Sequence, residues 1–340
     1  MKCSKTKTFF SLHMGLCLLS VLMLNSFAHA KPGEKTVLKK GNSELSFGDL
    51  SIAEQQNLFD IEFETFQRQK ALLENHVLDS YYSQEAEKKK LNKQQVEEQE
   101  NKTGDISEKD LKKFYEENKA RIPYPFEQVS GEIKNILQGQ KRQENRSKLI
   151  EKALKATKST IVLAEPTAPL VEIDTSPYHT FGKKGAKVKI VEFADYQCPH
   201  CKTATEAFKK IRANYKDKIE YVYIDYPINQ SGISKTVAMG AACAAKQNKY
   251  WEYHELAFSK QSNLTKESVV TLAKDLKLDE PSFVACVANA ETSAFIERSK
   301  AEGDRVGVSG TPTIFVNGRR SRTAHTPEAI SKEIDELLKK

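Results

Sequence analysis

Residues 193–202 read FADYQCPHCK, and this stretch decides the fold of the second half of the chain. It contains two cysteines, Cys198 and Cys201, separated by two residues. The apolar run 186–194 (AKVKIVEFA) predicts a β-strand, and residues 198–215 predict a helix. Both cysteines therefore fall on the first turn of a helix that follows a strand, where free backbone N–H groups and the positive end of the helix dipole lie.

The chemistry of this junction favours a reactive thiol at Cys198. A thiolate at a helix N-terminus is stabilised, so its pKa falls below the roughly 8.5 of a free cysteine. Pro199 has a helical φ and lacks a backbone N–H that would go unpaired there. His200 adds a donor or a partial positive charge beside the sulfur. We expect Cys198 to be the exposed nucleophile and Cys201 to be the recessed resolving thiol.

Two other interpretations of the cysteine pair remain open. A zinc site needs four ligands, whereas one Cys-x-x-Cys pair supplies two, and the sequence shows no second such pair and no matching histidine pair. A purely structural disulfide between Cys198 and Cys201 is the second alternative. The strand–turn–helix context favours a redox-active pair over both, and we expect no cofactor and no metal. Asp195 and Lys202, which flank the cysteines, are expected to be surface residues.

Residues 180–340 resemble the DsbA branch of the thioredoxin family. The dipeptide between the cysteines, Pro199-His200, is the dipeptide of DsbA enzymes. Gly310 to Thr313, in the run SGTPTIFVNG, match the cis-proline loop of the family, and Glu192 matches its buried acid, six residues before Cys198. The helical stretch of about 231–305 corresponds to the DsbA-type insertion.

The resemblance implies an α/β thioredoxin fold with a DsbA-type helical insertion. It also implies that Glu192 relays protons beneath the site and that Pro312 forms a cis peptide bond beside the sulfurs. Thr311 stands where some DsbA enzymes have valine, and its hydroxyl group could hydrogen-bond a sulfur. The catalytic residues implied in this way are Cys198, Pro199, His200, Cys201, Glu192, Thr311 and Pro312.

The remaining elements of this half can be placed from their patterns. Residues 218–226 and 311–316 predict strands, and a short strand is expected at 320–324. Residues 327–340 predict a final helix, which Thr326 would cap.

A second pair of cysteines lies in the insertion. The four cysteines outside the first 30 residues allow three pairings, and the short spacing of Cys198 and Cys201 leaves Cys243 and Cys286 for each other. In an oxidising compartment a structural disulfide between two Ala-rich helical segments is expected, and two buried free thiols are the alternative. This pairing also resembles the Com1-like branch of DsbA relatives.

The first 30 residues have the pattern of a secretory signal peptide. Three lysines precede the apolar stretch 9–24, and Ala28-His29-Ala30 is a small-x-small cleavage site. We expect cleavage after Ala30, which would lower the formal charge from +7 to +4. A mildly basic chain with interspersed acids does not call for a nucleic-acid partner. The expected location is the periplasm, and association with the outer membrane is allowed.

Residues 31–165 contain no cysteine and predict an all-α domain. Apolar residues between Ile52 and Tyr81 lie on a helical stripe that includes Phe59, Phe63, Phe66, Leu73 and Val77. This stripe is either core within the chain or a subunit interface. The polar residues 88–104 are expected to connect this helix to the next one, which Ser107 is expected to cap. Residues 126–156 predict a further helix.

Residues 75–92 and 114–156 resemble the helical arm of SurA- and parvulin-type periplasmic chaperones, without the isomerase domain of those proteins. The resemblance implies a dimerisation or chaperone domain over 31–165. The proline-containing residues 166–179 predict a linker to the domain at 180–340.

Together these features predict a protein disulfide oxidoreductase or isomerase that acts outside the cytosol. Its expected partners are cysteine-containing exported proteins, a membrane redox partner of DsbB or DsbD type, and a second copy bound through residues 31–165. Oxidation and isomerisation both remain open as the main direction. The alternative is a periplasmic chaperone that binds unfolded secreted or outer-membrane proteins, with redox activity secondary.

Overall fold

The computed structural model describes residues 36–119, 122, 124–323 and 326–339. The predicted signal peptide lies outside the described residues. The chain divides into two units, Met1–Asp49 and Leu50–Lys340. The described part of the first unit is a hairpin of strands β1 (Thr36–Lys40) and β2 (Ser43–Ser46), followed by a short turn of 3-10 helix. The sequence analysis did not predict this hairpin.

The second unit begins with the helices α1 (Ile52–Lys89), α2 (Lys93–Asn101), α3 (Glu108–Asn118) and α4 (Phe126–Thr157). Capping boxes start the first three, and the predicted cap at Ser107 is among them. The helical nature of this region is confirmed. Helix α2 lies in the polar stretch that was expected to be a connection. The sequence did not predict this helix because Val96 is its one buried residue and the segment has almost no apolar pattern.

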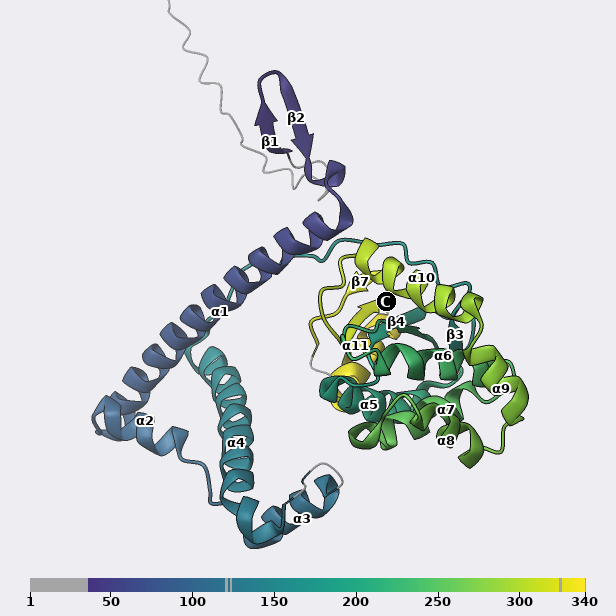
Figure 1. Cartoon of the computed structure of the whole chain (residues 1–340). Coiled ribbons are helices and arrows are strands. Elements are labelled where there is room, and N and C mark those ends of the chain that lie inside the picture. Colours follow the sequence, from purple (N-terminus) through teal and green to yellow (C-terminus); the bar gives the residue numbers. More distant parts are fainter. Residues whose placement is uncertain (1–35, 120–121, 123, 324–325, 340) are drawn as a thin grey trace, which may run out of the picture. The chain divides into compact units, whose positions relative to one another are not determined.

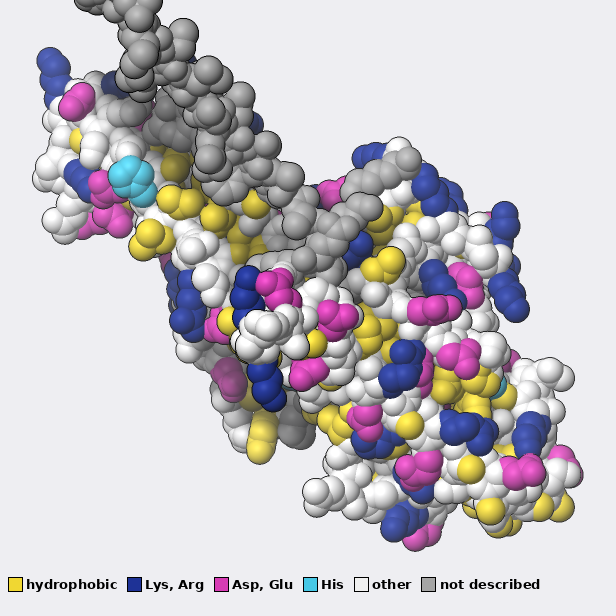
Figure 2. Space-filling view, turned by 90° about the horizontal axis from the view of Figure 1, so that it is seen from above, with side chains coloured by type: hydrophobic (Ala, Val, Ile, Leu, Met, Phe, Trp, Pro, Cys, Tyr) yellow, Lys and Arg dark blue, Asp and Glu magenta, His cyan; other side chains and the backbone are white. Residues whose placement is uncertain are grey.

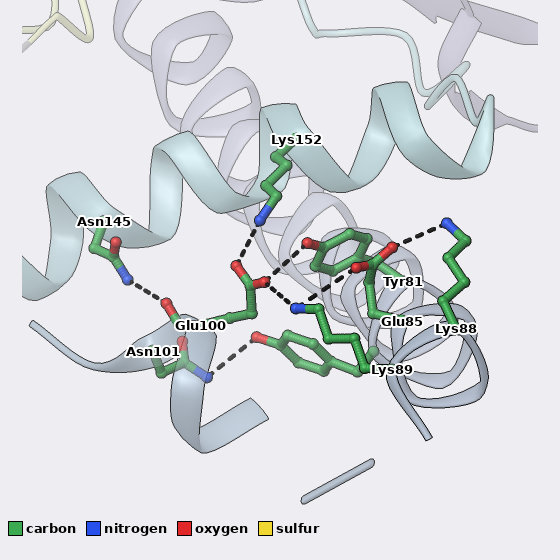
Figure 3. A network of polar contacts seen from close by, with 9 residues as sticks. Tyr81, Glu85, Lys88, Lys89, Glu100, Asn101, Asn145 and Lys152 are labelled. Carbon is green, nitrogen blue, oxygen red and sulfur yellow. Dashed lines mark hydrogen bonds and ion pairs between the residues drawn. The ribbon is translucent and has the colours of Figure 1, made fainter. Parts of the chain in front are cut away.

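Glu100 at the end of α2 joins three helices (Figure 3). Its carboxylate accepts hydrogen bonds from Lys152 Nζ on α4 at 2.7 Å and from the Tyr81 hydroxyl group on α1 at 3.1 Å. Its backbone oxygen accepts one from Asn145 Nδ2 at 3.0 Å. These bonds border a small apolar core formed by Val77, Leu78, Tyr81, Tyr82, Ala86, Val96, Leu149 and Ala153.

Most of the apolar stripe on α1 is buried within the chain. Phe59, Phe66, Val77 and Tyr81 are at most 7% exposed. These residues therefore follow the intramolecular interpretation of the stripe. Leu73 of the stripe is 37% exposed, and two apolar side chains of the same helix outside the stripe are more open to solvent, Ile61 at 62% and Leu72 at 70%.

The centre of the second half is one sheet with the strand order β3-β5-β4-β6-β7 among the described residues. Its strands are β3 (His179–Gly182), β4 (Val188–Ala194), β5 (Ile219–Asp225), β6 (Thr313–Val316) and β7 (Arg319–Arg320). Strands β4 and β5 are parallel and the other pairs are antiparallel. The thioredoxin-type arrangement is confirmed; β3 was not predicted, and the last strand is shorter than expected.

Helices cover both faces of this sheet (Figure 1). Ile190 of β4 shares a core with α5 (Pro199–Tyr215) and α11 (Pro327–Lys339). Phe193 faces the other side, where Gly303 lets α10 (Ala290–Arg305) approach its ring. Every residue of β5 is buried, as expected for a parallel strand covered on both faces.

The predicted insertion between β5 and β6 is helical. It contains α6 (Ile233–Ala245), α7 (Tyr250–Ser259), α8 (Ser268–Asp275), α9 (Glu280–Val287) and α10. Gly240 lets α6 and α7 approach closely, since a Cβ atom there would overlap the Tyr253 hydroxyl group. None of the helices in the described ranges has the length and apolar character needed to cross a bilayer. Figure 2 shows charged side chains of both signs interspersed on the face seen there.

Candidate active site

The two cysteines lie where β4 gives way to α5. Cys198 is the N-cap residue of α5 and is partly exposed, whereas Cys201 is fully buried on the first turn. The Cys198 thiol donates to the backbone oxygen of Thr311 at 3.3 Å, and Cys201 Sγ accepts from the backbone N–H of Asp195 at 3.5 Å. The sequence reading placed both sulfurs at this junction, and the structure brings them together there as free thiols.

The environment separates the two thiols chemically. Hydrogen bonding from the Cys201 thiol, against the opposing effect of burial, lowers the pKa of Cys198 to about 5; the Thr311 side chain and the backbone N–H groups of Cys201 and His200 contribute further. Burial raises the pKa of Cys201 far above its ordinary value, and the hydrogen bond to Cys198 and the negative charge of Glu192 add to the increase. At neutral pH the pair therefore consists of one exposed thiolate and one buried thiol.

Glu192 lies on the α5 side of the sheet and is 0% exposed. One carboxylate oxygen, Oε2, accepts a hydrogen bond from the Tyr221 hydroxyl group at 2.5 Å. The other, Oε1, has no hydrogen-bond partner among the described residues. Burial raises the pKa of Glu192 to about 7, although Tyr221 and the Arg212 guanidinium group act in the opposite direction. A carboxyl group with this pKa can both take and give a proton near neutral pH.

The loop between α10 and β6 closes the site from the other side. The Thr311–Pro312 peptide bond is cis. The Thr311 side chain lowers the pKa of both cysteines, and its buried hydroxyl group has no hydrogen-bond partner in the described part of the chain. Pro199 and the His200 ring are exposed to solvent. The contribution of His200 to Cys198 that the structure shows comes from its backbone N–H.

Asp195 is not the surface residue that the sequence analysis expected. It is 2% exposed, and its carboxylate accepts hydrogen bonds from the backbone N–H of Gln197 at 2.6 Å, from the backbone N–H of Ile228 at 2.8 Å and from Ser234 Oγ at 2.5 Å. An acidic residue that directly follows a buried strand was the available signal. Asp195 therefore fastens the active-site loop to the segment that leads into α6.

Gln261, in the insertion, is a second residue that the sequence analysis missed. Its amide Nε2 donates to the backbone oxygens of Tyr196 and Cys198, each at 2.9 Å. No local pattern marks this residue, because it lies more than 60 positions from the loop that it contacts. The insertion thus holds the backbone on both sides of the reactive sulfur.

The other two cysteines are joined. Cys243 on α6 and Cys286 on α9 form a disulfide across a sequence separation of 43 residues. Throughout the described ranges, no group of three or more His, Cys, Asp and Glu side chains is arranged to hold a metal ion. The titratable side chains with shifted pKa values that the site contains are the two thiols and the buried carboxyl group of Glu192.

Comparison with known proteins gives a family for this half of the chain. Residues 174–336 match the thioredoxin family. The Na(+)/H(+) antiporter NhaA 3 of Salinispora tropica is 32% identical over 166 residues, which are 48% of this chain and 25% of that protein. Disulfide bond formation protein D of Bacillus subtilis is 28% identical over 169 residues, 46% of this chain and 76% of that protein.

Among solved structures, BdbD from Bacillus subtilis in its oxidised form aligns with a TM-score of 0.47 and 23% identity, over 51% of this chain and 100% of that one. The chain spans about a quarter of the length of the antiporter relatives and about three quarters of the disulfide bond formation proteins. The matched segment contains β4, α5, the insertion and the loop at Thr311. Residues 174–336 are therefore a thioredoxin-family domain.

Proposed function

We propose that this chain is a thiol–disulfide oxidoreductase that acts outside the cytosol and forms or isomerises disulfides in exported proteins. The observation that carries the proposal is the pair of thiols with opposite pKa shifts at the start of α5. A sulfur that is a stable thiolate is a good leaving group, so a disulfide at Cys198 is readily opened by another thiol. The disulfide-forming relatives support the same direction of chemistry.

In the oxidising direction, a substrate thiolate attacks Cys198 Sγ of the Cys198–Cys201 disulfide. The bond between the two enzyme sulfurs breaks, Cys201 leaves and takes a proton, and a mixed disulfide forms. A second substrate thiolate then attacks the substrate sulfur of this bond, and Cys198 leaves as a thiolate. The substrate loses two electrons and the enzyme gains two, so an oxidising membrane partner of DsbB type is needed to restore the disulfide, whereas a reducing partner of DsbD type would keep the pair as thiols for isomerisation.

Glu192 has the proton that this cycle needs. Cys201 would be a poor leaving group as a buried thiolate, because burial strongly disfavours its charge. A neighbouring carboxyl group with a pKa of about 7 can protonate Cys201 as it leaves and remove the proton in the reverse step. We assign Glu192 this relay role, Thr311 and Pro312 the contact with substrate backbone beside Cys198, and Pro199 and His200 the shaping of the exposed turn.

Titration of the Cys198 thiolate tests the proposal. Its ultraviolet absorbance should appear with a midpoint near pH 5, and Thr311→Val should move the midpoint upward because the hydroxyl group no longer stabilises the charge. Since the pKa is lowered, the thiolate stabilises the reduced fold above about pH 9, and this contribution disappears as the pH falls through about 5. Cys198→Ala is the matched control, which lacks this dependence. A midpoint near the ordinary value of a cysteine would rule out the proposed chemistry.

The helical half supports a second role. The exposed side chains of Ile61 and Leu72 on α1 offer apolar surface to another chain. We propose that residues 31–165 form a domain that dimerises and binds unfolded clients, with 166–179 as its linker to the redox domain. In the alternative function, client binding by this domain is the main activity and the redox activity is secondary. The predicted signal sequence supports periplasmic location.

The state of association should depend on this surface. Leu72→Lys introduces a charge where 70% of the leucine is exposed, so it should weaken a dimer while leaving the fold intact. Leu170→Lys, at an exposed leucine outside α1, is the control. Light scattering measures the mass, and suppression of client aggregation measures binding. A full-length chain that is monomeric at all concentrations contradicts the dimer, and unchanged client protection by the Leu72 variant contradicts the binding surface.

A further inference from the structure

Buried side chains lie between the Glu192 carboxylate and a buried cation. Tyr221 on β5 is 1% exposed, and its hydroxyl group donates to Glu192 Oε2 at 2.5 Å. The Tyr221 ring stacks on Phe208 of α5, with centroids 4.8 Å apart. The phenol is thus fixed both by its ring and by its hydroxyl group, and it occupies Oε2 while Oε1 stays unpaired in the described part of the molecule.

The cation is Arg212 on α5, which is 4% exposed. Its guanidinium carbon lies 4.5 Å from the centroid of the Trp251 ring and 5.8 Å from that of Tyr221. The same group pairs with Glu255 of α7 at 2.9 Å. Aromatic faces attract a buried cation, so these rings hold a positive charge close to the phenol. That charge favours the ionised form of Glu192.

We propose that Tyr221, supported by Arg212, is a positioning residue that holds the Glu192 carboxylate with Oε1 free to exchange a proton with Cys201, and thereby sets the pH at which mixed disulfides at Cys198 are resolved. The inference rests on the proposed oxidoreductase function and on the relay role of Glu192. The inference adds that Tyr221 positions the Glu192 carboxylate and lowers its pKa.

The step is a thiol–disulfide exchange within the enzyme. The proton of the Cys201 thiol passes to Glu192, and the resulting Cys201 thiolate attacks Cys198 Sγ of the mixed disulfide. The bond between Cys198 and the substrate sulfur breaks, and the substrate leaves as a thiolate that takes a proton from water. In this step the Cys201 sulfur is oxidised from thiol to disulfide and the departing substrate sulfur is reduced from disulfide to thiol, so no external oxidant or reductant is needed. Only the ionised form of Glu192 can accept the proton, so the rate falls on the acidic side.

The groups that act on Glu192 come from several elements. Tyr221 on β5 and Arg212 on α5 favour its charge, whereas burial and the negative charge of Cys198 oppose it. Cys201, on the first turn of α5, interacts with it electrostatically. On α7, Glu255 pairs with Arg212, and burial holds the pKa of His254 well below its ordinary value. On β6, the residue paired with Glu192 is Ile314, which is apolar and carries no charge. Removal of the Tyr221 hydroxyl group therefore raises the pKa of Glu192.

The experiment uses the full chain with a labelled glutathione mixed disulfide at Cys198, and follows single-turnover release of glutathione from pH 5 to 9. The acidic limb of the pH–rate profile, where the release rate falls as Glu192 becomes protonated, should move to higher pH in Tyr221→Phe. Release should be about tenfold slower at pH 6 and unchanged at pH 9, as expected for the loss of a hydrogen bond to a charged group. The matched control is Tyr223→Phe. Tyr223 lies on the same strand, is 1% exposed, and its hydroxyl group has no partner among the described residues.

The outcomes separate the inference from the function beneath it. A shifted limb in Tyr221→Phe, an unshifted one in Tyr223→Phe and loss of the limb in Glu192→Gln support the inference. If the chain turns over but Tyr221→Phe leaves the limb in place, or if both tyrosine variants move it equally, the inference is overturned while the proposed function stands. A wild-type chain without any release overturns both.

An infrared measurement covers the case in which Tyr221→Phe does not fold. In the wild-type chain the C–O stretch of one tyrosine should shift as Glu192 titrates, because its hydroxyl group donates to that carboxylate. Both signals should vanish in Glu192→Gln. A Glu192 titration that is accompanied by no change in a tyrosine band overturns the inference.

Discussion

Cys198→Ser should reduce the thiol–disulfide turnover of the full chain by at least about a thousandfold, to the level of the uncatalysed exchange. A serine hydroxyl group is not ionised near neutral pH and forms no disulfide, whereas Cys198 is partly exposed and has a pKa of about 5. Reduction of insulin by dithiothreitol and refolding of scrambled ribonuclease measure the two directions of the reaction. The loss should appear in both.

Cys201→Ser is the matched control for this prediction. Its Cys198 thiolate remains, so the variant should form mixed disulfides but fail to resolve them, and substrate proteins should accumulate as covalent adducts. The remaining cysteines cannot replace the site, because Cys243 and Cys286 are joined to each other. Turnover of more than a few per cent in Cys198→Ser would show that Cys198 is not the nucleophile.

Replacement of both Cys243 and Cys286 by alanine should lower the free energy of unfolding by about 4 kcal/mol in the chain-entropy account of disulfides. The bridge spans 43 residues and joins α6 to α9 within the insertion. Without it the unfolded chain gains the freedom that the closed loop removes. Denaturant unfolding of the oxidised wild type and of the double variant measures the difference.

The variant Cys198→Ala/Cys201→Ala provides the comparison, since it also lacks two sulfurs but closes no long loop. It should lose much less stability than the variant without the bridge. A loss below about 1 kcal/mol for Cys243→Ala/Cys286→Ala would mean that the bridge constrains the unfolded state little.

The sequence was most informative where one local pattern carries the structure. The apolar run before Cys198 predicted β4, and the cysteines and Pro199 predicted the start of α5. The capping residue Ser107 predicted the start of α3 in the same way. In each case the deciding residues lie within a few positions of one another, so periodicity and capping rules suffice.

Other features depend on contacts between distant segments. Helix α2 has a single buried residue, Val96, and β3 gains its place by pairing with β5 about 40 positions later. Neither has an apolar pattern of its own. The hydrogen bond between Tyr221 and Glu192 joins the neighbouring strands β5 and β4. The alternation of apolar residues within each strand does not show the parallel register that brings the two side chains together.

Asp195 illustrates the same limit at the site. Charged residues beside a reactive motif are usually solvated, which favoured a surface position. The structure buries the carboxylate because three elements supply donors: the turn at Gln197, the segment at Ile228 and the first turn of α6 at Ser234. The donors at Ile228 and Ser234 lie more than 30 positions away, and no pattern in the sequence shows that they contact Asp195.

The anchors of the loop at Cys198 have a consequence for the catalytic cycle. The Asp195 carboxylate and the Gln261 amide group bind backbone and hydroxyl groups, and neither of them bonds to a sulfur. We therefore expect these anchors to persist when the two cysteines gain or lose electrons. The loop would then keep one backbone conformation in the dithiol and the disulfide forms.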